Sequence, residues 1–210
     1  KEYKLPIGCD VPETIILADG DFPSHPLALE WLRQCPYVVC CDGAANTYIR
    51  SGRMPEAIVG DGDSLLPDIK ERYASLIHSE AEQETNDLSK AFRFCLSQER
   101  KRITIMGATG KREDHTIGNV SLLADYMEQA EVSMMTDYGI FVPIREDSMF
   151  ESYIGQQISV FNMNSTALSA EGLAYPLSVF TNWWQGTLNE ALARHFIIRT
   201  EGKVLVFRVF

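Results

Sequence analysis

The chain has 210 residues, of which 45% are hydrophobic and 23% charged, and its formal net charge at pH 7 is −10. This composition is typical of a folded globular protein with one large domain or two small ones, and it excludes extensive disorder. The negative charge and the lack of a long run of Lys or Arg argue against nucleic acid as a partner, and no stretch approaches the roughly 18 apolar residues of a membrane helix.

The five cysteines are an odd number without the spacing of a disulfide framework. Cys40 and Cys41 are adjacent in an apolar stretch, where neighbouring side chains of a strand face opposite ways. We therefore expect buried thiols in a reducing, cytoplasmic environment. The first residues, KEYKLPIGCD, lack both the layout of a signal peptide and an initiating Met.

In the first half, short apolar runs alternate with helical patterns. The predicted strands are 14–18, 37–41, 57–60, 102–107 and 132–136, and the predicted helices are 26–34, 44–52, 67–73, 86–98 and 115–129. Strands that take turns with helices favour a parallel sheet covered on both faces. We predict an α/β parallel-sheet domain over residues 1–138.

After residue 139 the sequence changes to short alternating segments separated by Gly, Asn and Ser. These segments are 139–144, 148–155, 156–164 and 195–210, and they predict antiparallel strands. Glu201 and Gly202, between two alternating runs, predict a terminal hairpin. No linker separates the halves, so we expect a smaller antiparallel domain over 139–210, packed closely on the first.

Polar residues gather where predicted strands of the first half end. The four groups are Cys41 to Asn46, Gly60 to Ser64, Gln83 to Asp87 leading to Lys90, and Gly107 to His115. Parallel strands place their carboxyl ends at one edge of the sheet, which is where ligands bind in open α/β sheets. We expect the four groups to converge there.

The segment AIVGDGDSL, residues 57–65, ends a predicted strand with two aspartates one residue apart. A turn needs only one such residue, and two carboxylates repel each other unless a cation lies between them. Asp61, Asp63 and Asp87 are therefore candidate Mg²⁺ ligands, and Asp42 is the next candidate. Arg112 and Lys90 could neutralise phosphate oxygens, and Gly107 and Gly110 could let a polyphosphate approach the backbone.

Two familiar motifs are excluded by their spacing. GATGKRED has two residues between its glycines, where a P-loop needs four, and Arg112 follows the lysine where Ser or Thr is required. In a calcium loop counted from Asp61, Leu66 stands where Gly is required and Arg72 stands where Glu is required.

Several candidates also have structural interpretations. Asp87 could be a first-turn residue paired with Lys90. Asp42 and Asp114 could each cap the following helix, with His115 a satisfied hydrogen-bonding residue. Trp183 and Trp184 fit packing, although an extended backbone would leave one of them for a flat cationic ligand.

At these stretches the sequence resembles the thiamin pyrophosphokinases nearly from end to end. The resemblance lies in D-G-A-A-N at 42–46, G-D-x-D-S at 60–64, the Gln and Asp-x-x-Lys pattern at 83–90, and G-x-x-G-x-R-x-D-H-T-x-x-N at 107–119. The second half adds 158–160, 172–173, 175–177 and 181–182. The chain departs from the usual family pattern at Gly62, often aromatic, at Asn86, often Thr, and at Thr181, often Ser.

The resemblance implies an α/β domain that holds ATP and Mg²⁺, followed by a β-sandwich domain that helps to hold thiamin. It implies a homodimer with each active site between subunits. By matching positions, Asp61, Asp63 and Asp87 resemble the metal and phosphate carboxylates, and Arg112 with Asp114 the nucleotide-binding pair. Other expected contacts to ATP are Asp42, Asn46, Ser64, Lys90, Gly107, Gly110 and His115; those to thiamin are Gln83, Asn86, Thr181, Asn182 and Trp183.

The expected reaction is diphosphoryl transfer from ATP to the hydroxyl of thiamin, giving thiamin diphosphate and AMP. Such chemistry depends on positioning and charge neutralisation more than on a strong base. Two alternatives stay open: a D-x-D metal-dependent sugar transferase or phosphohydrolase, and a non-catalytic sensor of a nucleotide or thiamin. Three acidic ligands argue against the sensor, because a simple polyphosphate binder would gain from cations instead.

Overall fold

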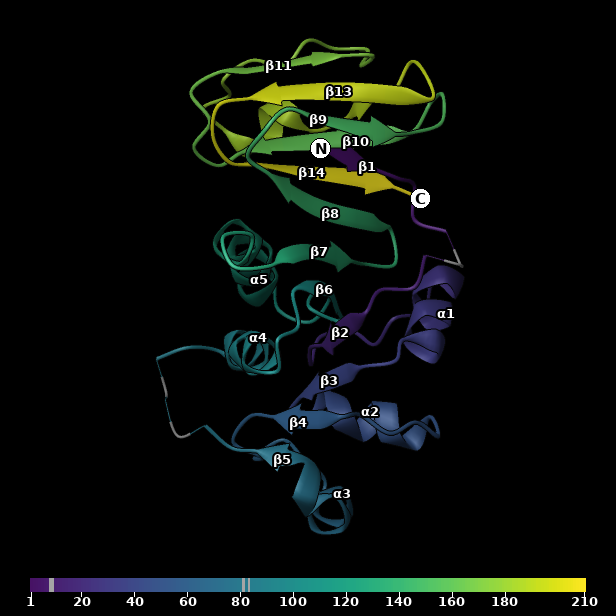
Figure 1. Ribbon diagram of the computed structural model, residues 1–210, viewed down its shortest axis with the longest axis vertical. Helices are drawn as coiled ribbons and strands as arrows, with labels where there is room; N and C mark the ends of the chain where they lie inside the picture. Colours follow the sequence, from purple (N-terminus) through teal and green to yellow (C-terminus); the bar gives the residue numbers. More distant parts are fainter. Residues whose placement is uncertain (8–9, 81, 83) are drawn as a thin grey trace.

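The computed structural model describes residues 1–7, 10–80, 82 and 84–210, and its strands form one sheet of ten and a second of four. The long sheet runs through the molecule, and the smaller sheet lies at one end (Figure 1). The helices are α1 (Pro26–Gln34), α2 (Ala44–Arg50), α3 (Pro67–Arg72), α4 (Asp87–Ser97) and α5 (Glu113–Tyr126), with 3₁₀ helices η1 (Ala74–Leu76) and η2 (Trp183–Gly186). The strands of the first half are β1 (Glu2–Tyr3), β2 (Thr14–Leu17), β3 (Val38–Cys41), β4 (Ala57–Val59), β5 (Ile77–His78), β6 (Arg102–Met106) and β7 (Glu131–Met135). Those of the second half are β8 (Gly139–Ile144), β9 (Ser148–Glu151), β10 (Gln157–Asn162), β11 (Leu168–Glu171), β12 (Asn189–Glu190), β13 (His195–Thr200) and β14 (Val204–Val209).

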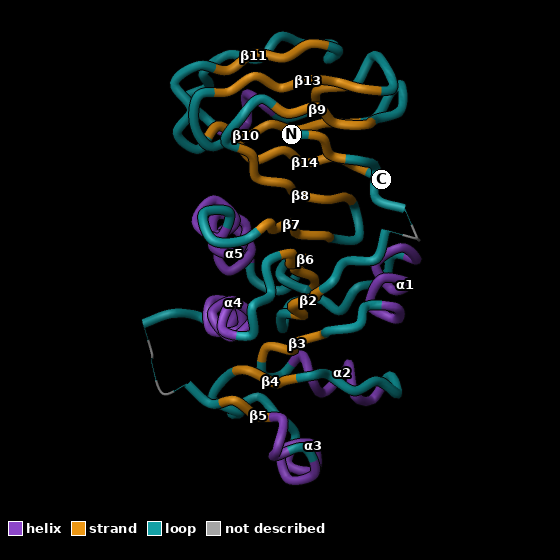
Figure 2. The backbone as a smooth tube through the Cα atoms, viewed as in Figure 1, coloured by secondary structure: helices purple, strands orange, loops and turns teal. Residues whose placement is uncertain are grey.

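The first half of the long sheet is parallel and has helices on both faces. Its strand order is β7-β6-β2-β3-β4-β5, and every neighbouring pair in this series is parallel. Helices α1, α2 and α3 pack on one face, and α4 and α5 on the other (Figure 2). Cys40 and Cys41 are buried free thiols that pack on opposite faces, as their adjacent positions predict. The predicted α/β half is therefore confirmed, with β5 as an additional short strand.

The second half continues the same sheet without a break. β8 pairs antiparallel with β7, and β14, β10 and β12 follow in turn. The smaller sheet, in the order β1-β9-β13-β11, packs on this antiparallel part around a shared apolar core. The two halves thus share backbone hydrogen bonds as well as side-chain contacts.

The terminal hairpin predicted around Glu201 and Gly202 is wrong. β13 pairs with β9 and β11 in the smaller sheet, whereas β14 pairs with β8 and β10 in the long sheet. Phe196 of β13 and Val206 of β14 are both buried in the core between the sheets. Alternating apolar residues suit two strands that face each other across a core as well as two paired strands, so the pattern alone does not separate these arrangements.

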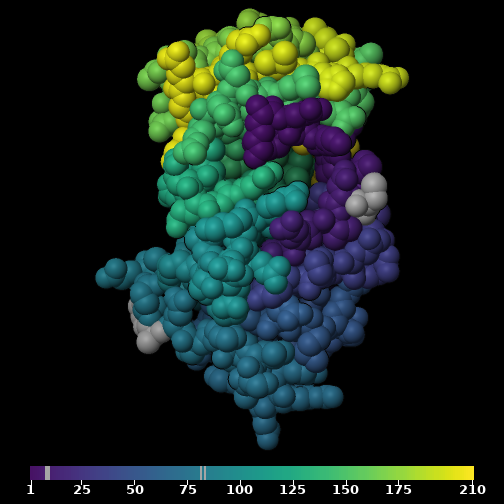
Figure 3. Space-filling model, in the orientation of Figure 1, coloured from purple at the N-terminus to yellow at the C-terminus, as the bar shows by residue number. Residues whose placement is uncertain are grey.

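The first residues of the chain lie with the second half. Glu2 and Tyr3 pair with Met149 and Phe150 of β9, and the Tyr3 ring stacks on Phe150 with 4.8 Å between ring centroids. In Figure 3 this segment, in purple, lies across the surface of that end of the molecule. β1 could not be predicted from the sequence, because a strand of two residues is too short to show periodicity.

Candidate active site

A cleft of about 380 Å³ lies at the carboxyl ends of the central parallel strands, where the order of the strands in the sheet switches direction. β2 has β3 on one side and β6 on the other, so the loops after β2 and β6 leave the sheet at its switch point. These two loops contact each other, since the amide of Gly20 donates to the carbonyl of Gly107 at 2.6 Å and the amide of Asp21 donates to Thr109 at 2.8 Å. The cleft is lined by residues 18–20, Cys41, 86–88, 108–109, 111–112, 115–116 and Asn119.

Asp42, directly after β3, is a buried carboxylate beside this cleft. Its φ is +32°, and its Oδ2 accepts a hydrogen bond from the amide of Ser64 at 3.1 Å. Its Oδ1 is buried and has no hydrogen-bond partner among the described residues. Burial raises the pKa of Asp42 to about 6, and the nearby charges of Asp61 and Asp87 add to the shift.

The chain passes very close to Asp42 at Gly60. A Cβ placed at Gly60 would lie 2.8 Å from the Cβ of Asp42 and 3.4 Å from the Cγ of Asp87. The loops after β3 and β4 and the start of α4 therefore meet here, as the sequence predicts for Asp42, Asp61 and Asp87.

Asp61 and Asp63 form a local turn. Asp61 Oδ1 accepts a hydrogen bond from the amide of Asp63 at 3.0 Å, and this bond lowers the pKa of Asp61. Asp63 is exposed, and the described contacts connect it to Asp61 through its backbone. Within the described residues, no three His, Cys, Asp or Glu side chains are already arranged to hold a metal ion.

Two basic side chains, Arg112 at the cleft and Lys90 beside it, are each paired with an aspartate. Lys90 is buried, and its Nζ lies 3.3 Å from Asp87 Oδ1, which confirms the expected pair on α4. Arg112 donates from Nε and Nη2 to the two carboxylate oxygens of Asp114, at 3.0 and 2.6 Å. This bidentate pair lowers the pKa of Asp114 to about 2.

A chain of side-chain amides connects α4, α5 and the loop after β6. Asn86 caps α4, with its Oδ1 accepting from the amide of Ser89 at 2.9 Å. Asn86 Nδ2 donates to Asn119 Oδ1 at 3.1 Å, and Asn119 Nδ2 donates to the carbonyl of Ala108 at 2.9 Å. His115 is exposed and lines the same cleft.

Both capping interpretations are wrong. Arg112 occupies the N-cap of α5, so Asp114 lies in the first turn of that helix. Gly43 occupies the N-cap of α2, and Asp42 accepts from Ser64 instead.

Gly107 and Gly110 do not line this cleft, and the space beside each is occupied by the chain itself. A Cβ at Gly107 would meet the carbonyl oxygen of Ala18 at 2.7 Å, and the side chain of Asp21 lies against Gly110. Both glycines have a positive φ, so their conformation serves the contact between the loops.

Asn46 organises the loop after β4. Its Nδ2 donates to the carbonyl of Ser64 at 2.8 Å, and its Oδ1 accepts from the amide of Leu66 at 3.0 Å. The expected roles of Asn46 and Ser64 toward ATP thus coincide with a positioning role for this loop.

Sequence reasoning missed Asp19 and Lys111, which both line the cleft. Lys111 Nζ lies 3.2 Å from Asp19 Oδ1, and a Cβ at Gly43 would lie 2.5 Å from Asp19 Oδ2. The signal was present, because Asp19 follows the first strand of the sheet in the same way as Asp42 follows the second.

Three expected substrate residues lie away from the cleft, beside β10. Thr181 and Asn182 precede η2, and Asn182 forms a capping box with Gln185. Trp183 is 45% exposed and meets Phe161 of β10 edge-on, with 6.1 Å between ring centroids. Trp184 is 73% exposed. The tryptophans lie in a 3₁₀ helix, so the extended backbone considered for them is wrong; Gln83 lies outside the described residues.

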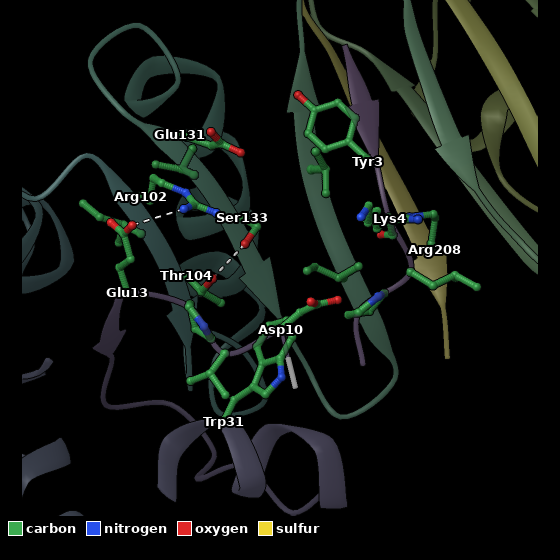
Figure 4. Close-up of a pocket in the computed structure, with 18 of the residues that line it drawn as sticks. Tyr3, Lys4, Asp10, Glu13, Trp31, Arg102, Thr104, Glu131, Ser133 and Arg208 are labelled. Atoms are coloured by element: carbon green, nitrogen blue, oxygen red, sulfur yellow. Dashed lines mark hydrogen bonds and ion pairs between the residues drawn. The ribbon is translucent and has the colours of Figure 1, made fainter. Parts of the chain in front are cut away.

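A larger cleft of about 540 Å³ opens at the opposite ends of β6 and β7, but it holds none of the predicted site residues. Within it, Arg102 pairs with Glu13, and Thr104 bonds to Ser133, each at 3.1 Å (Figure 4). Buried Arg208 donates to the backbone carbonyls of Glu151 and Lys4. We therefore place the candidate site at the smaller cleft.

In the described part of the chain, no helix has the length and apolar character needed to cross a membrane.

Comparisons with known proteins identify relatives of this chain. The chain aligns over 129 residues, at 30% identity, with thiamine pyrophosphokinase 1 of Oryza sativa subsp. japonica, covering 50% of this chain and 49% of that protein. It aligns over 110 residues, at 30% identity, with thiamin pyrophosphokinase 1 of Caenorhabditis elegans, covering 48% and 45%. These alignments span about half the length of the curated relatives.

Solved structures show the same fold over nearly the whole chain. The thiamin pyrophosphokinase from Candida albicans superposes with a TM-score of 0.81 at 18% identity, over 100% of this chain and 92% of that one. The yeast enzyme of the same name superposes with a TM-score of 0.80 at 16% identity, over 100% and 91%.

Two family profiles match the sequence itself. The thiamin pyrophosphokinase catalytic domain matches residues 28–135, and the thiamin pyrophosphokinase substrate-binding domain matches residues 139–207. The first match alone covers more than half of the 210 residues, and Asp42, Asp61 and Asp87 lie within it. The chain belongs to the thiamin pyrophosphokinase family.

Proposed function

We propose that the protein is a thiamin diphosphokinase, which transfers the diphosphoryl group of ATP to the hydroxyl of thiamin and releases AMP. The observation that carries this proposal is the gathering of Asp42, Asp61 and Asp87 beyond the carboxyl ends of β3 and β4, in a sheet whose sequence matches the family's catalytic domain. Residues 1–138 would hold ATP and the metal, and residues 139–210 would form a β-sandwich that helps to bind thiamin.

Asp61, Asp63 and Asp87 would hold Mg²⁺, with Asp42 beside them. The donor set fits a hard cation, because all of these ligands are carboxylates and the buried Oδ1 of Asp42 lacks a hydrogen-bond partner among the described residues. Mg²⁺ usually completes its coordination with waters and substrate phosphates, so a fully preformed protein cage is not required. When bound, the ion would offset negative charge on the polyphosphate.

The other candidate residues, of which Arg112 and His115 line the cleft, would position the nucleotide. Arg112 and Lys90 would balance charge on the transferred group, and Asp114 would keep the Arg112 guanidinium in one orientation through its two hydrogen bonds. The other proposed contacts to ATP are Asn46, Ser64, Gly107, Gly110 and His115. The thiamin hydroxyl would attack the β-phosphorus in line, and the protein would contribute mainly by positioning both substrates.

The proposed thiamin residues favour a homodimer. Thr181, Asn182 and Trp183 lie beside β10, which is five strand positions from β2 in the long sheet. At the usual strand spacing this separation is about 24 Å. A second copy could bring the same residues to the cleft, with Gln83 and Asn86 contributed by the first.

Product analysis tests the reaction. With ATP, Mg²⁺ and thiamin, we expect AMP and thiamin diphosphate to form in equal amounts. Release of phosphate or use of a nucleotide sugar would instead support a hydrolase or sugar transferase, and binding without any product would support a sensor. Each of these results would contradict the proposed kinase.

Asp61→Asn tests the metal assignment. The substitution removes a charge from the cluster, and we expect turnover to fall by about 100-fold or more while the circular dichroism spectrum is unchanged. Asp68→Asn is the matched control, because Asp68 is an exposed aspartate in the first turn of the neighbouring α3. Near-normal turnover in Asp61→Asn would refute the assignment.

A further inference from the structure

Lys70 on α3 differs in its hydrogen-bond partner from the other basic residues near Asp42, Asp61 and Asp87. Lys90, Lys111 and Arg112 each form an ion pair with an aspartate. Lys70 forms no ion pair within the described part of the chain, and its Nζ donates instead to the backbone carbonyl of Gly62 at 2.9 Å. Gly62 is the residue between Asp61 and Asp63.

The Lys70 side chain occupies the place where a side chain of residue 62 would lie. A Cβ built on Gly62 would be 3.3 Å from both Cε and Nζ of Lys70. Gly62 has a φ of +78°, a conformation that a glycine adopts without steric cost. Lys70 is exposed, and the residue before it in α3, Ile69, is buried in the core and anchors the helix.

The turn from Gly60 to Ser64 has few other restraints at its centre. Asp61 accepts from the amide of Asp63, and Ser64 donates to Asp42, so both ends are held. Gly62 lies between them, and its carbonyl accepts a hydrogen bond from Lys70. Loss of that bond would let the peptide rotate and would move both neighbouring carboxylates.

We infer that Lys70 is a positioning residue, which fixes the orientation of the Asp61 and Asp63 carboxylates for a divalent cation. This inference rests on the proposed function only in taking these carboxylates as the cation's ligands. A simple charge effect has the opposite sign: a lysine ammonium repels a nearby cation, so its removal would strengthen cation binding. A higher Kd for the cation after removal of Lys70 would therefore indicate a positioning role, and a lower Kd would indicate charge repulsion alone.

Mn²⁺ is a suitable probe, because its free concentration can be followed by electron paramagnetic resonance without substrate. We expect Lys70→Met to raise the Kd for Mn²⁺ about tenfold, since a lost hydrogen bond from a charged donor is worth about one decade. Lys70→Arg keeps a donor for the Gly62 carbonyl and should bind Mn²⁺ within about twofold of the wild type. Lys101→Met is the matched control, because Lys101 also donates to a backbone carbonyl, that of Gln129, at 3.4 Å.

In steady-state assays, the same Lys70→Met change should raise the Mg²⁺ concentration needed for half-maximal activity and leave the KM for thiamin unchanged. An unchanged or lower Kd for Mn²⁺ in Lys70→Met would overturn the inference, as would a wild type that binds no Mn²⁺. A wild type that binds Mn²⁺ tightly and forms no thiamin diphosphate would refute the proposed reaction and leave the positioning role supported by the binding data.

Discussion

At the scale of single residues, the buried Asp42 carboxyl makes stability depend on pH. Its pKa in the folded protein is raised to about 6, above the value of about 4 in an unfolded chain. The folded state therefore favours the protonated form, and the free energy of unfolding should fall as pH rises from about 4 to about 6.

Asp42→Asn should remove that dependence. The amide oxygen can still accept from Ser64, and the variant avoids a buried charge near Asp61 and Asp87. In metal-free urea titrations we expect it to be about 1 kcal/mol more stable than the wild type at pH 7 and nearly equal at pH 4.5. A variant less stable at pH 7 would contradict this account; Asp68→Asn, with an exposed side chain, is the control.

The sequence identified most of the acidic residues because each follows a strand or begins a helix. Asp42, Asp61 and Asp87 could be predicted to meet from the order of elements alone. The partners of the nearby lysines could not be predicted from the sequence. The ion pair of Lys111 with Asp19 and the hydrogen bond of Lys70 to the Gly62 carbonyl depend on how separate segments pack. Asp19 was missed since only one of two nearby aspartates, Asp19 and Asp21, faces the cleft.

At the scale of elements, two glycines in or near α5 should respond to alanine in opposite ways. Gly118 lies within α5, and an added Cβ would meet no atom within 4 Å. Gly110 precedes α5 with a φ of +101°, and an added Cβ would collide with Asp21. Alanine is favoured over glycine in a helix, whereas a positive φ and a collision both disfavour it.

We expect Gly118→Ala to raise the free energy of unfolding by about 0.5–1 kcal/mol and Gly110→Ala to lower it by about 2 kcal/mol or more. Thermal unfolding of both variants, followed by circular dichroism, provides the measurement. Equal effects of the two substitutions would show that the loop around Gly110 can rearrange at little cost.

The longer elements of the parallel half were predictable because their apolar pattern is strong. α1 was predicted with its observed bounds, and most of the other predicted ends differ by one or two residues. β1, β5 and β12 have two residues each, too few to show a period. The sequence also could not show that β13 and β14 belong to different sheets. A hairpin and two strands in facing sheets bury the same alternating side chains.

At the scale of the whole molecule, the distance between the candidate active-site cleft and η2 leads to a test of shared active sites. Asp61→Asn would damage the cleft of its own subunit, and Asn182→Ala would damage the opposite side of the site. Consider a dimer of one Asp61→Asn subunit and one Asn182→Ala subunit. If each site contains residues from both subunits, one site of this dimer carries both substitutions and the other carries neither.

After the two inactive variants are mixed, unfolded and refolded together, we expect about one quarter of wild-type activity from random pairing. Each variant refolded alone should stay inactive. Failure of the mixture to recover activity, with dimers present by light scattering, would show that each site is complete within one subunit.

The outermost strands of the long sheet, β12 and β5, have only two residues each, and β1 ends the smaller sheet in the same way. Such short borders offer few free amide and carbonyl groups to a strand from another molecule. Copies of this chain should therefore associate through side chains on their faces and resist growth into ribbons or fibrils, even at high concentration.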